Sequence, residues 1–282
     1  MSALEQYEII ARDVALFDER NFVPRVEAIE LLESEIFDEE GRTLLTALEE
    51  VDERLFARLR MEIAAGRHRG KEFEMLLLDY FSEQDLRTGD LRAGDDPGYS
   101  ALDIFVNRLC TYLPMPEPTL ILEAEMVDYH KTPASVVLEI ARRVEPEDVF
   151  VDLGAGLGQV ALLVHLVTGA RVVGLEIEPA FCAYAQECIA GLGLTDAVSF
   201  IEGDARFADL SEGTVFFMYT PFTGVLLETA FELLRLEALK RSFKLVTFGP
   251  CTKHAANLNW LRADGTLEDR AAFSLWSGRC GR

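Results

Sequence analysis

The stretch VFVDLGAGLGQVALLV, residues 149–164, decides the fold because it joins two kinds of apolar pattern through closely spaced glycines. Residues 149–151 have the composition of a buried strand, and the residues from Gln159 onward repeat with helical spacing. The turn between them lets a ligand approach the backbone closely. It contains three glycines: Gly154, Gly156 and Gly158.

Short apolar strands alternate with amphipathic helices from Pro133 onward. This alternation predicts a parallel sheet that is covered by helices on both faces, a doubly wound α/β architecture. We expect helices over residues 134–144, 159–167, 180–192 and 224–239. We expect strands over residues 148–153, 170–177, 197–203, 214–220, 243–249 and 270–278.

The N-terminal part of the chain has a different pattern. Helical spacing recurs over residues 4–17, 25–37, 42–63, 71–81 and 100–113, and most of the formal net charge of −22 lies before residue 126. Three prolines then stop the last helix: Pro114, Pro116 and Pro118. We therefore predict an acidic all-helical domain over residues 1–118 and the α/β domain over residues 119–282.

Composition narrows the range of partners. No apolar run approaches the ~20 residues that a membrane span needs, so we expect no membrane contact and a cytoplasmic location. The five cysteines form no C-x-x-C pair, which favours reduced thiols and no metal site. The negative net charge disfavours nucleic acid as a partner and favours a protein or a small molecule.

Acidic residues at three successive strand ends point to the ligand. A nicotinamide fingerprint needs a glycine three residues after Gly156, where this chain has Gln159, so an oxidoreductase is disfavoured. Asp152 beside the glycines suits an ammonium group. Glu176, about 20 residues further on, has the spacing of a ribose ligand, and Asp204 can accept from an adenine amine. S-adenosylmethionine combines these three parts.

These segments show a family resemblance. From about residue 129 to residue 250 the chain resembles the class I, seven-strand S-adenosylmethionine-dependent methyltransferases, which have a Rossmann-like sheet. Within that superfamily, the segments FVDLGAGLGQVALLV, GLEIEP, YHKT and TVFFMYTPFTG look similar to histone-lysine methyltransferases of the disruptor-of-telomeric-silencing type. The resemblance implies that Tyr129 and Thr132 close over the methionine part of the cofactor.

The predicted cofactor site combines the residue argument with this resemblance. It consists of Tyr129, Thr132, Asp152, Gly154, Ala155, Gly156, Gly158, Gln159, Glu176, Ile177, Asp204 and Ala205. The bound molecules would be S-adenosylmethionine and its product, S-adenosylhomocysteine.

The acceptor side departs from the resembled branch. After the fourth strand that branch has an asparagine-rich segment, where this chain has YTPF, residues 219–222. Lacking an amide to hold a planar nitrogen, the segment disfavours adenine or glutamine as acceptor. We expect Tyr219, Thr220 and Phe222 to form the catalytic side and to present a protein lysine or another amine. A small-molecule N- or O-methyltransferase and a catalytically silent cofactor-binding module remain alternatives.

Overall fold

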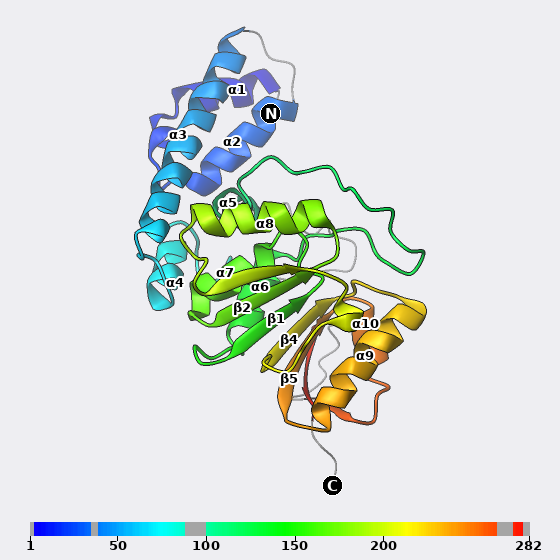
Figure 1. Ribbon diagram of the computed structural model, residues 1–282. Coiled ribbons are helices and arrows are strands. Elements are labelled where there is room, and N and C mark those ends of the chain that lie inside the picture. The colour runs from blue at the N-terminus through cyan, green and yellow to red at the C-terminus, as the bar shows by residue number, and fades with distance from the viewer. Residues whose placement is uncertain (1–2, 35–38, 88–99, 264–272, 279–282) are drawn as a thin grey trace.

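The computed structural model describes residues 3–34, 39–87, 100–263 and 273–278, and centres on one seven-stranded sheet (Figure 1). The strand order is β3-β2-β1-β4-β5-β7-β6, which confirms the predicted Rossmann-like sheet. The strands are β1 Val149–Leu153, β2 Arg171–Glu176, β3 Val198–Glu202, β4 Val215–Tyr219, β5 Phe243–Phe248, β6 Leu261–Ala263 and β7 Phe273–Gly278.

Strands β1 to β5 are parallel, and β7 runs antiparallel to β5 and to β6. The central strands are apolar because helices cover both of their faces, as the near-complete burial of β1 and β4 shows. The parallel register brings the carboxyl ends of β1, β2 and β4 to one edge. A ligand in such a sheet binds beyond that edge.

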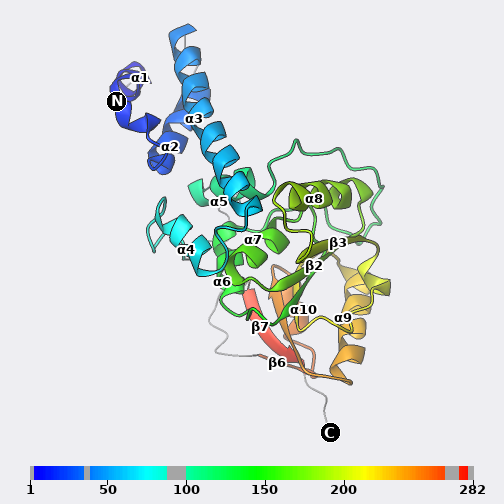
Figure 2. The same ribbon diagram turned by 60° about the vertical axis from the view of Figure 1, so that its left-hand side comes forward.

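Helices flank the sheet on both sides (Figures 1 and 2). Residues of α6, α7 and α8 pack in one hydrophobic core, and residues of α9 and α10 pack in the core of the opposite face. The helices there are α6 Ala134–Ala141, α7 Gln159–Thr168, α8 Pro179–Gly191, α9 Gly224–Ala238 and α10 Cys251–Ala255. The short α10 and β6 were not predicted.

The N-terminal helices are connected to the sheet by a shared core. They are α1 Ala3–Arg12, α2 Phe22–Ser34, α3 Glu39–Ala64, α4 Lys71–Leu78 and α5 Ala101–Cys110. Helices α4 and α5 contact α7, and one hydrophobic cluster runs from Phe22 in α2 to Phe248 in β5. The domain division at residue 118 therefore stays a prediction, since no break in packing accompanies it.

A buried charge network fixes these helices to one another. Arg25 in α2 donates to Asp52 in α3 at 2.6 Å, and Arg108 in α5 donates to the second oxygen of Asp52 at 2.6 Å. Pairing is required here because a buried guanidinium without a partner would be costly. No helix within the described ranges has the length and apolar character needed to cross a bilayer.

Residues 114–133 connect α5 to α6 as a long segment without regular structure, which we call the strap. The strap runs outside α8 and returns to the sheet edge (Figures 1 and 2). Its residue Met126 forms an isolated antiparallel bridge with Phe222, so the strap reaches the loop after β4. The proline-rich part before the predicted domain boundary thus belongs to the cover of that edge.

Candidate functional site

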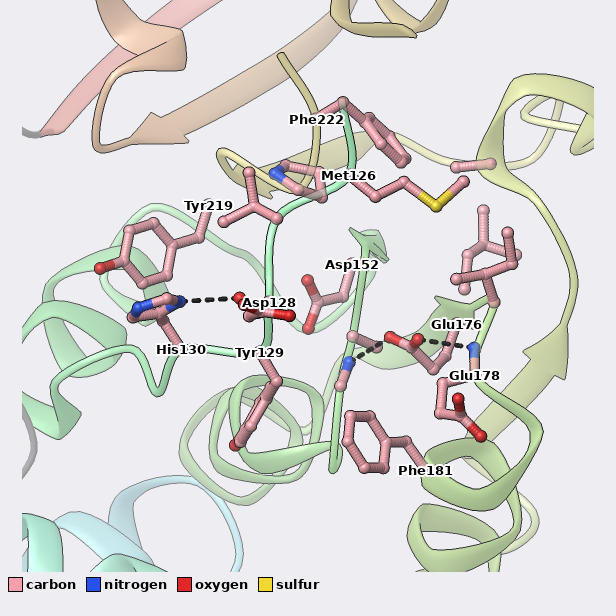
Figure 3. Close-up of a pocket in the computed structure, with 18 of the residues that line it drawn as sticks. Met126, Asp128, Tyr129, His130, Asp152, Glu176, Glu178, Phe181, Tyr219 and Phe222 are labelled. Carbon is pink, nitrogen blue, oxygen red and sulfur yellow. Dashed lines mark hydrogen bonds between the residues drawn. The ribbon is translucent and has the colours of Figure 1, made fainter. Parts of the chain in front are cut away.

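A pocket of about 690 Å³ lies at the carboxyl ends of the parallel strands, between the sheet edge and the strap (Figure 3). Its wall includes every residue of the predicted cofactor and catalytic sets except Gly158. From those sets it brings together Tyr129, Thr132, Asp152, Gly154, Ala155, Gly156, Gln159, Glu176, Ile177, Asp204, Ala205, Tyr219, Thr220 and Phe222.

The glycine turn after β1 depends on left-handed backbone. Gly156 has φ +54°, and a Cβ built there would overlap the ring of Tyr129. Gly158 has φ +85°, but a Cβ there would overlap the ring of Phe200 instead. Gly158 therefore serves the packing of the turn against β3, and its predicted place in the cofactor site is not supported by the pocket wall.

Asp152 at the end of β1 is a buried carboxylate without a full set of partners. Its Oδ2 has no hydrogen-bond donor in the described part of the chain. Burial, with the nearby charge of Glu176, raises the pKa of Asp152 to about 8. A carboxylate held in this way favours a ligand that brings a positive charge.

Glu176 at the end of β2 shapes the turn. One carboxylate oxygen accepts from the Gly156 N–H at 2.6 Å and the other from the Glu178 N–H at 2.9 Å. Burial raises the pKa of Glu176, and the backbone N–H donors partly oppose that rise. Because each oxygen has two lone pairs, the carboxylate retains capacity to accept from two ligand hydroxyls.

The carboxylate of Asp204 after β3 already has hydrogen-bond partners within the protein, which the sequence did not suggest. Its carboxylate accepts from Arg206 Nε at 2.9 and 2.8 Å and caps the short helix η2, Ala205–Phe207. Burial raises the pKa of Asp204, but the hydrogen bonds from Arg206 outweigh it and the pKa is lowered. Asp204 thus lies in the wall as a paired carboxylate, and its contact with adenine stays a prediction.

The first tether of the strap is at the start of α8. Thr119 Oγ1 donates to one oxygen of Glu178 at 2.6 Å, and the Leu120 N–H donates to the other at 2.8 Å. Burial raises the pKa of Glu178, yet the hydrogen bonds from Thr119, Leu120 and Ala180 outweigh it and lower the pKa to about 2. Glu178 is therefore ionised at neutral pH and accepts both hydrogen bonds as a carboxylate.

Further tethers hold the middle of the strap. Glu123 pairs with Arg206 at 2.8 Å, and Glu125 accepts from the Leu226 N–H at 2.9 Å at the start of α9. Closer to α6, the rings of Tyr129 and Phe181 pack edge-to-face, with their centroids 5.6 Å apart. The strap is thereby fixed to η2, α8 and α9, elements from three parts of the chain.

The loop after β4 forms the remaining wall. The Tyr219 ring is half-buried and packs on the Phe248 ring, with the two ring centroids 4.6 Å apart. Phe222 is buried. Thr220 has φ +38°, and its hydroxyl donates to the Phe248 carbonyl and accepts from the Cys251 N–H, each at 3.1 Å. The Thr220 hydroxyl is thus committed to holding this loop, and its part in catalysis stays a prediction.

Several wall residues were missed by sequence reasoning. Glu178 lies within the GLEIEP segment, residues 174–179, and Phe181 follows it, so the acidic residue before a helix-starting proline was an available signal. Met126, Asp128 and His130 belong to the strap, and no periodicity marks them. Figure 3 shows these strap side chains across the pocket from Glu178.

Comparison with known proteins agrees with this geometry. Residues 121–246 match the model of the TRM5/TYW2 methyltransferase domain. A search of the curated proteins found no match.

Three solved structures are similar to this chain. An RNA methyltransferase from Salinibacter ruber in complex with S-adenosylhomocysteine is 28% identical with a TM-score of 0.44, over 53% of this chain and 94% of that one. A tRNA methyltransferase from M. jannaschii is 16% identical with a TM-score of 0.40, over 52% of this chain and 50% of that one. A geranyl diphosphate C-methyltransferase from Streptomyces coelicolor A3(2) is 15% identical with a TM-score of 0.38, over 51% and 78%.

The matches support some of the expectations from the sequence and leave others without support. They give no support to the histone-lysine subgroup or to the exclusion of nucleic acid as a partner. The domain match, the strand order and the strand-end pocket agree on the cofactor and on the class of reaction. The chain is an S-adenosylmethionine-dependent methyltransferase with a Rossmann-like sheet.

Proposed function

We propose that this methyltransferase transfers its methyl group to an amine nitrogen, with the side chain of a protein lysine as the principal acceptor. The reaction class and the cofactor are established above. The acceptor and the roles of individual residues are the content of the proposal. We derive them from the charges and contacts of the pocket wall.

The residues present fit S-adenosylmethionine, which supplies a methyl group activated on a sulfonium. Asp152, with its unpartnered Oδ2, would accept from the ammonium group of the cofactor. Glu176 would accept from the ribose hydroxyls with its remaining lone pairs. Tyr129, which packs on Gly156, would cover the methionine part from the strap side.

The charge of the wall is the observation that carries the choice of acceptor. The described residues that line the pocket include no lysine and no arginine. They include one histidine and five acidic residues: Asp128, Asp152, Glu176, Glu178 and Asp204. A phosphate group beside the pocket would find no cation in this wall, whereas an amine finds carboxylates and aromatic rings.

The acceptor side works mainly by alignment. Methyl transfer from a sulfonium to a neutral nucleophile disperses charge, so the wall must hold the two reacting atoms in line and exclude water. Tyr219 and Phe222 would form the two sides of the acceptor channel, since both line the pocket beyond Asp152. Thr220 keeps them in place through its bonds to Phe248 and Cys251.

A second candidate is methylation of an RNA nucleotide. The match of residues 121–246 to the TRM5/TYW2 methyltransferase domain favours it. Binding of RNA would then need cations outside the pocket wall, because the wall itself supplies none. The two candidates differ in which polymer receives the methyl group.

Label transfer separates them. Purified protein is incubated with methyl-labelled S-adenosylmethionine and a cell extract, and protein, RNA and small molecules are then separated and counted. Label in protein, located on lysine by mass spectrometry, supports the amine acceptor, and label that ribonuclease releases supports the second candidate. Label only in small molecules contradicts both, and no label in any fraction favours the silent module. Gly156→Val, whose side chain would fill the space of the Tyr129 ring, is the negative control for label transfer.

A further inference from the structure

His130 occupies a place in the pocket that the proposed function leaves unused. It lies on the strap, lines the pocket and is exposed. Figure 3 shows its ring and the ring of Tyr219 on the side of the pocket that faces away from Glu178. Tyr219 is the residue that we place at the acceptor channel, so His130 lines the same side of the pocket as the expected path of the acceptor.

One contact fixes the tautomer of this histidine. Its Nδ1 lies 2.7 Å from the backbone carbonyl oxygen of Asp128. A carbonyl oxygen only accepts, so Nδ1 carries the hydrogen and donates it. In the neutral ring, Nε2 is then left with a free lone pair. This geometry suits a group that receives a proton.

The buried carboxylates of the wall are engaged in other contacts. Glu176 accepts from two backbone N–H groups, and Glu178 accepts from Thr119 and from two backbone N–H groups. Asp204 is paired with Arg206. Asp152 is buried and is assigned to the ammonium group of the cofactor.

The phenols of the wall are poor proton acceptors as well. Burial raises the pKa of Tyr129 and of Tyr219, so both keep their protons near neutral pH. Asp128 is exposed, and carboxylates in water are in general weaker bases than imidazole by about two pKa units. Among the described wall residues, His130 thus remains as the side chain suited to general-base chemistry.

We propose that His130 is the general base of the transfer. Its Nε2 takes a proton from the acceptor ammonium, which leaves a neutral amine with a free electron pair. That pair attacks the methyl carbon of the cofactor, a carbon–nitrogen bond forms, and the carbon–sulfur bond breaks with its electrons on sulfur. The products are the methylated ammonium, S-adenosylhomocysteine and a protonated imidazole, which releases its proton to water because the ring is exposed.

This inference rests on the proposed amine acceptor, and other charged groups lie in the same wall. The titratable side chains that share the pocket wall with the ring include Asp128 on the strap, Asp152 at the end of β1 and Tyr219 at the end of β4. Lys131 is its neighbour in sequence and does not line the pocket. Lys131 therefore offers a matched control on the same loop.

The test compares His130→Asn with Lys131→Gln. The amide of the first variant can still donate to the Asp128 carbonyl, but it lacks the basic Nε2. Initial rates of lysine methylation are measured from pH 6 to pH 10 on the acid-soluble protein fraction of a cell extract, and S-adenosylhomocysteine binding is measured by calorimetry. At pH 7 we expect His130→Asn to lower the rate by about 10²–10⁴-fold, with unchanged cofactor affinity, and Lys131→Gln to match the wild type.

The pH profile distinguishes loss of a base from a structural effect. As the pH rises the acceptor amine loses its own proton, so the defect of His130→Asn should shrink, and added imidazole should partly restore the rate of His130→Gly at pH 7. Parallel profiles at all pH values, or a His130→Asn variant as fast as the wild type, overturn the role of His130 while lysine methylation stands. Wild-type label on RNA or small molecules instead of lysine overturns the proposed acceptor and this role together.

Discussion

The two halves of the pocket are built in different ways. The cofactor half comes mainly from residues 152–178, which are contiguous in the chain and use backbone turns with left-handed φ values, and the strap and the end of β3 add a few side chains to it. The acceptor half combines the strap with the loop after β4, segments about ninety residues apart that meet at the Met126–Phe222 bridge. Local backbone geometry therefore defines where the cofactor binds, and long-range contacts define what it meets.

The largest expected effect is a loss of cofactor affinity. Gly156→Ala would place a methyl group in the ring of Tyr129 and force an L residue to φ +54°. The left-handed conformation costs about 1–2 kcal/mol, and the overlap costs about 1–3 kcal/mol more. We expect S-adenosylhomocysteine affinity, measured by calorimetry, to fall by at least about 30-fold, in line with the lower part of that sum.

A matched glycine separates strain from overlap. Gly169 also has positive φ, +76°, but nothing lies within 4 Å of a Cβ built there. Gly169→Ala should lower thermal stability by the backbone cost alone and leave cofactor affinity unchanged. An equal loss of affinity in both variants would show that the contact with Tyr129 does not shape the site.

The second test uses the unpartnered carboxyl group of Asp152 in the cofactor half. Burial and the charge of Glu176 raise the pKa of Asp152 from 3.8 to about 8, so within that window the folded free protein holds a proton that the unfolded chain releases. Wild-type stability therefore falls as the pH rises. The amide of Asp152→Asn has no proton to hold, so in urea unfolding the advantage of the variant should grow by about 1.4 kcal/mol per pH unit across the window.

Adding the cofactor should reverse that advantage. The ammonium group would supply the missing partner of Asp152, so S-adenosylmethionine should raise the melting temperature of the wild type more than that of Asp152→Asn. A pH-independent stability difference would contradict the raised pKa, and equal cofactor-induced shifts would contradict the ammonium assignment.

A smaller loss of affinity is expected from the ribose side. Glu176→Ala removes a carboxylate that holds the Gly156 and Glu178 N–H groups and that we assign to the ribose hydroxyls. Cofactor binding should weaken by about 1–3 kcal/mol, the range for charge-assisted hydrogen bonds. Adenosine affinity should drop in parallel, because the ribose is common to both ligands, and an unchanged adenosine affinity would remove Glu176 from the ribose contact.

The same contrast explains what the sequence could predict. The strand, the glycine turn and the following helix lie within residues 149–164, so apolar periodicity and glycine spacing locate them without tertiary information. The cofactor wall followed from that stretch because parallel strands end at one edge. The cofactor contact of Gly158 stays a prediction, because a φ requirement and a ligand contact look alike in a sequence and the structure shows this glycine packed against Phe200.

The acceptor half could not be predicted from the sequence, because its contacts join residues that are far apart in the chain. The proline-rich start of the strap has the composition of a linker, yet Thr119 bonds to Glu178, 59 residues away. The hydroxyl of Thr220 could not be recognised as a loop support, since its partners Phe248 and Cys251 come from β5 and α10. Hydrogen-bond partners at such separations follow from the folded arrangement alone.

The smallest expected effect probes the connection between the halves. Thr119→Val removes the hydroxyl that donates to Glu178 at 2.6 Å, while the Leu120 N–H keeps its bond to the same carboxylate. The loss of one hydrogen bond, about 1 kcal/mol, loosens the strap over the bound cofactor. Stopped-flow dissociation of S-adenosylhomocysteine should therefore become about fivefold faster. Thr229→Val removes a comparable hydroxyl on α9, which donates to the Val225 carbonyl at 2.8 Å, and should leave dissociation unchanged. Equal dissociation rates in the wild type and in Thr119→Val would mean that the strap does not gate the cofactor, so the two halves would act independently.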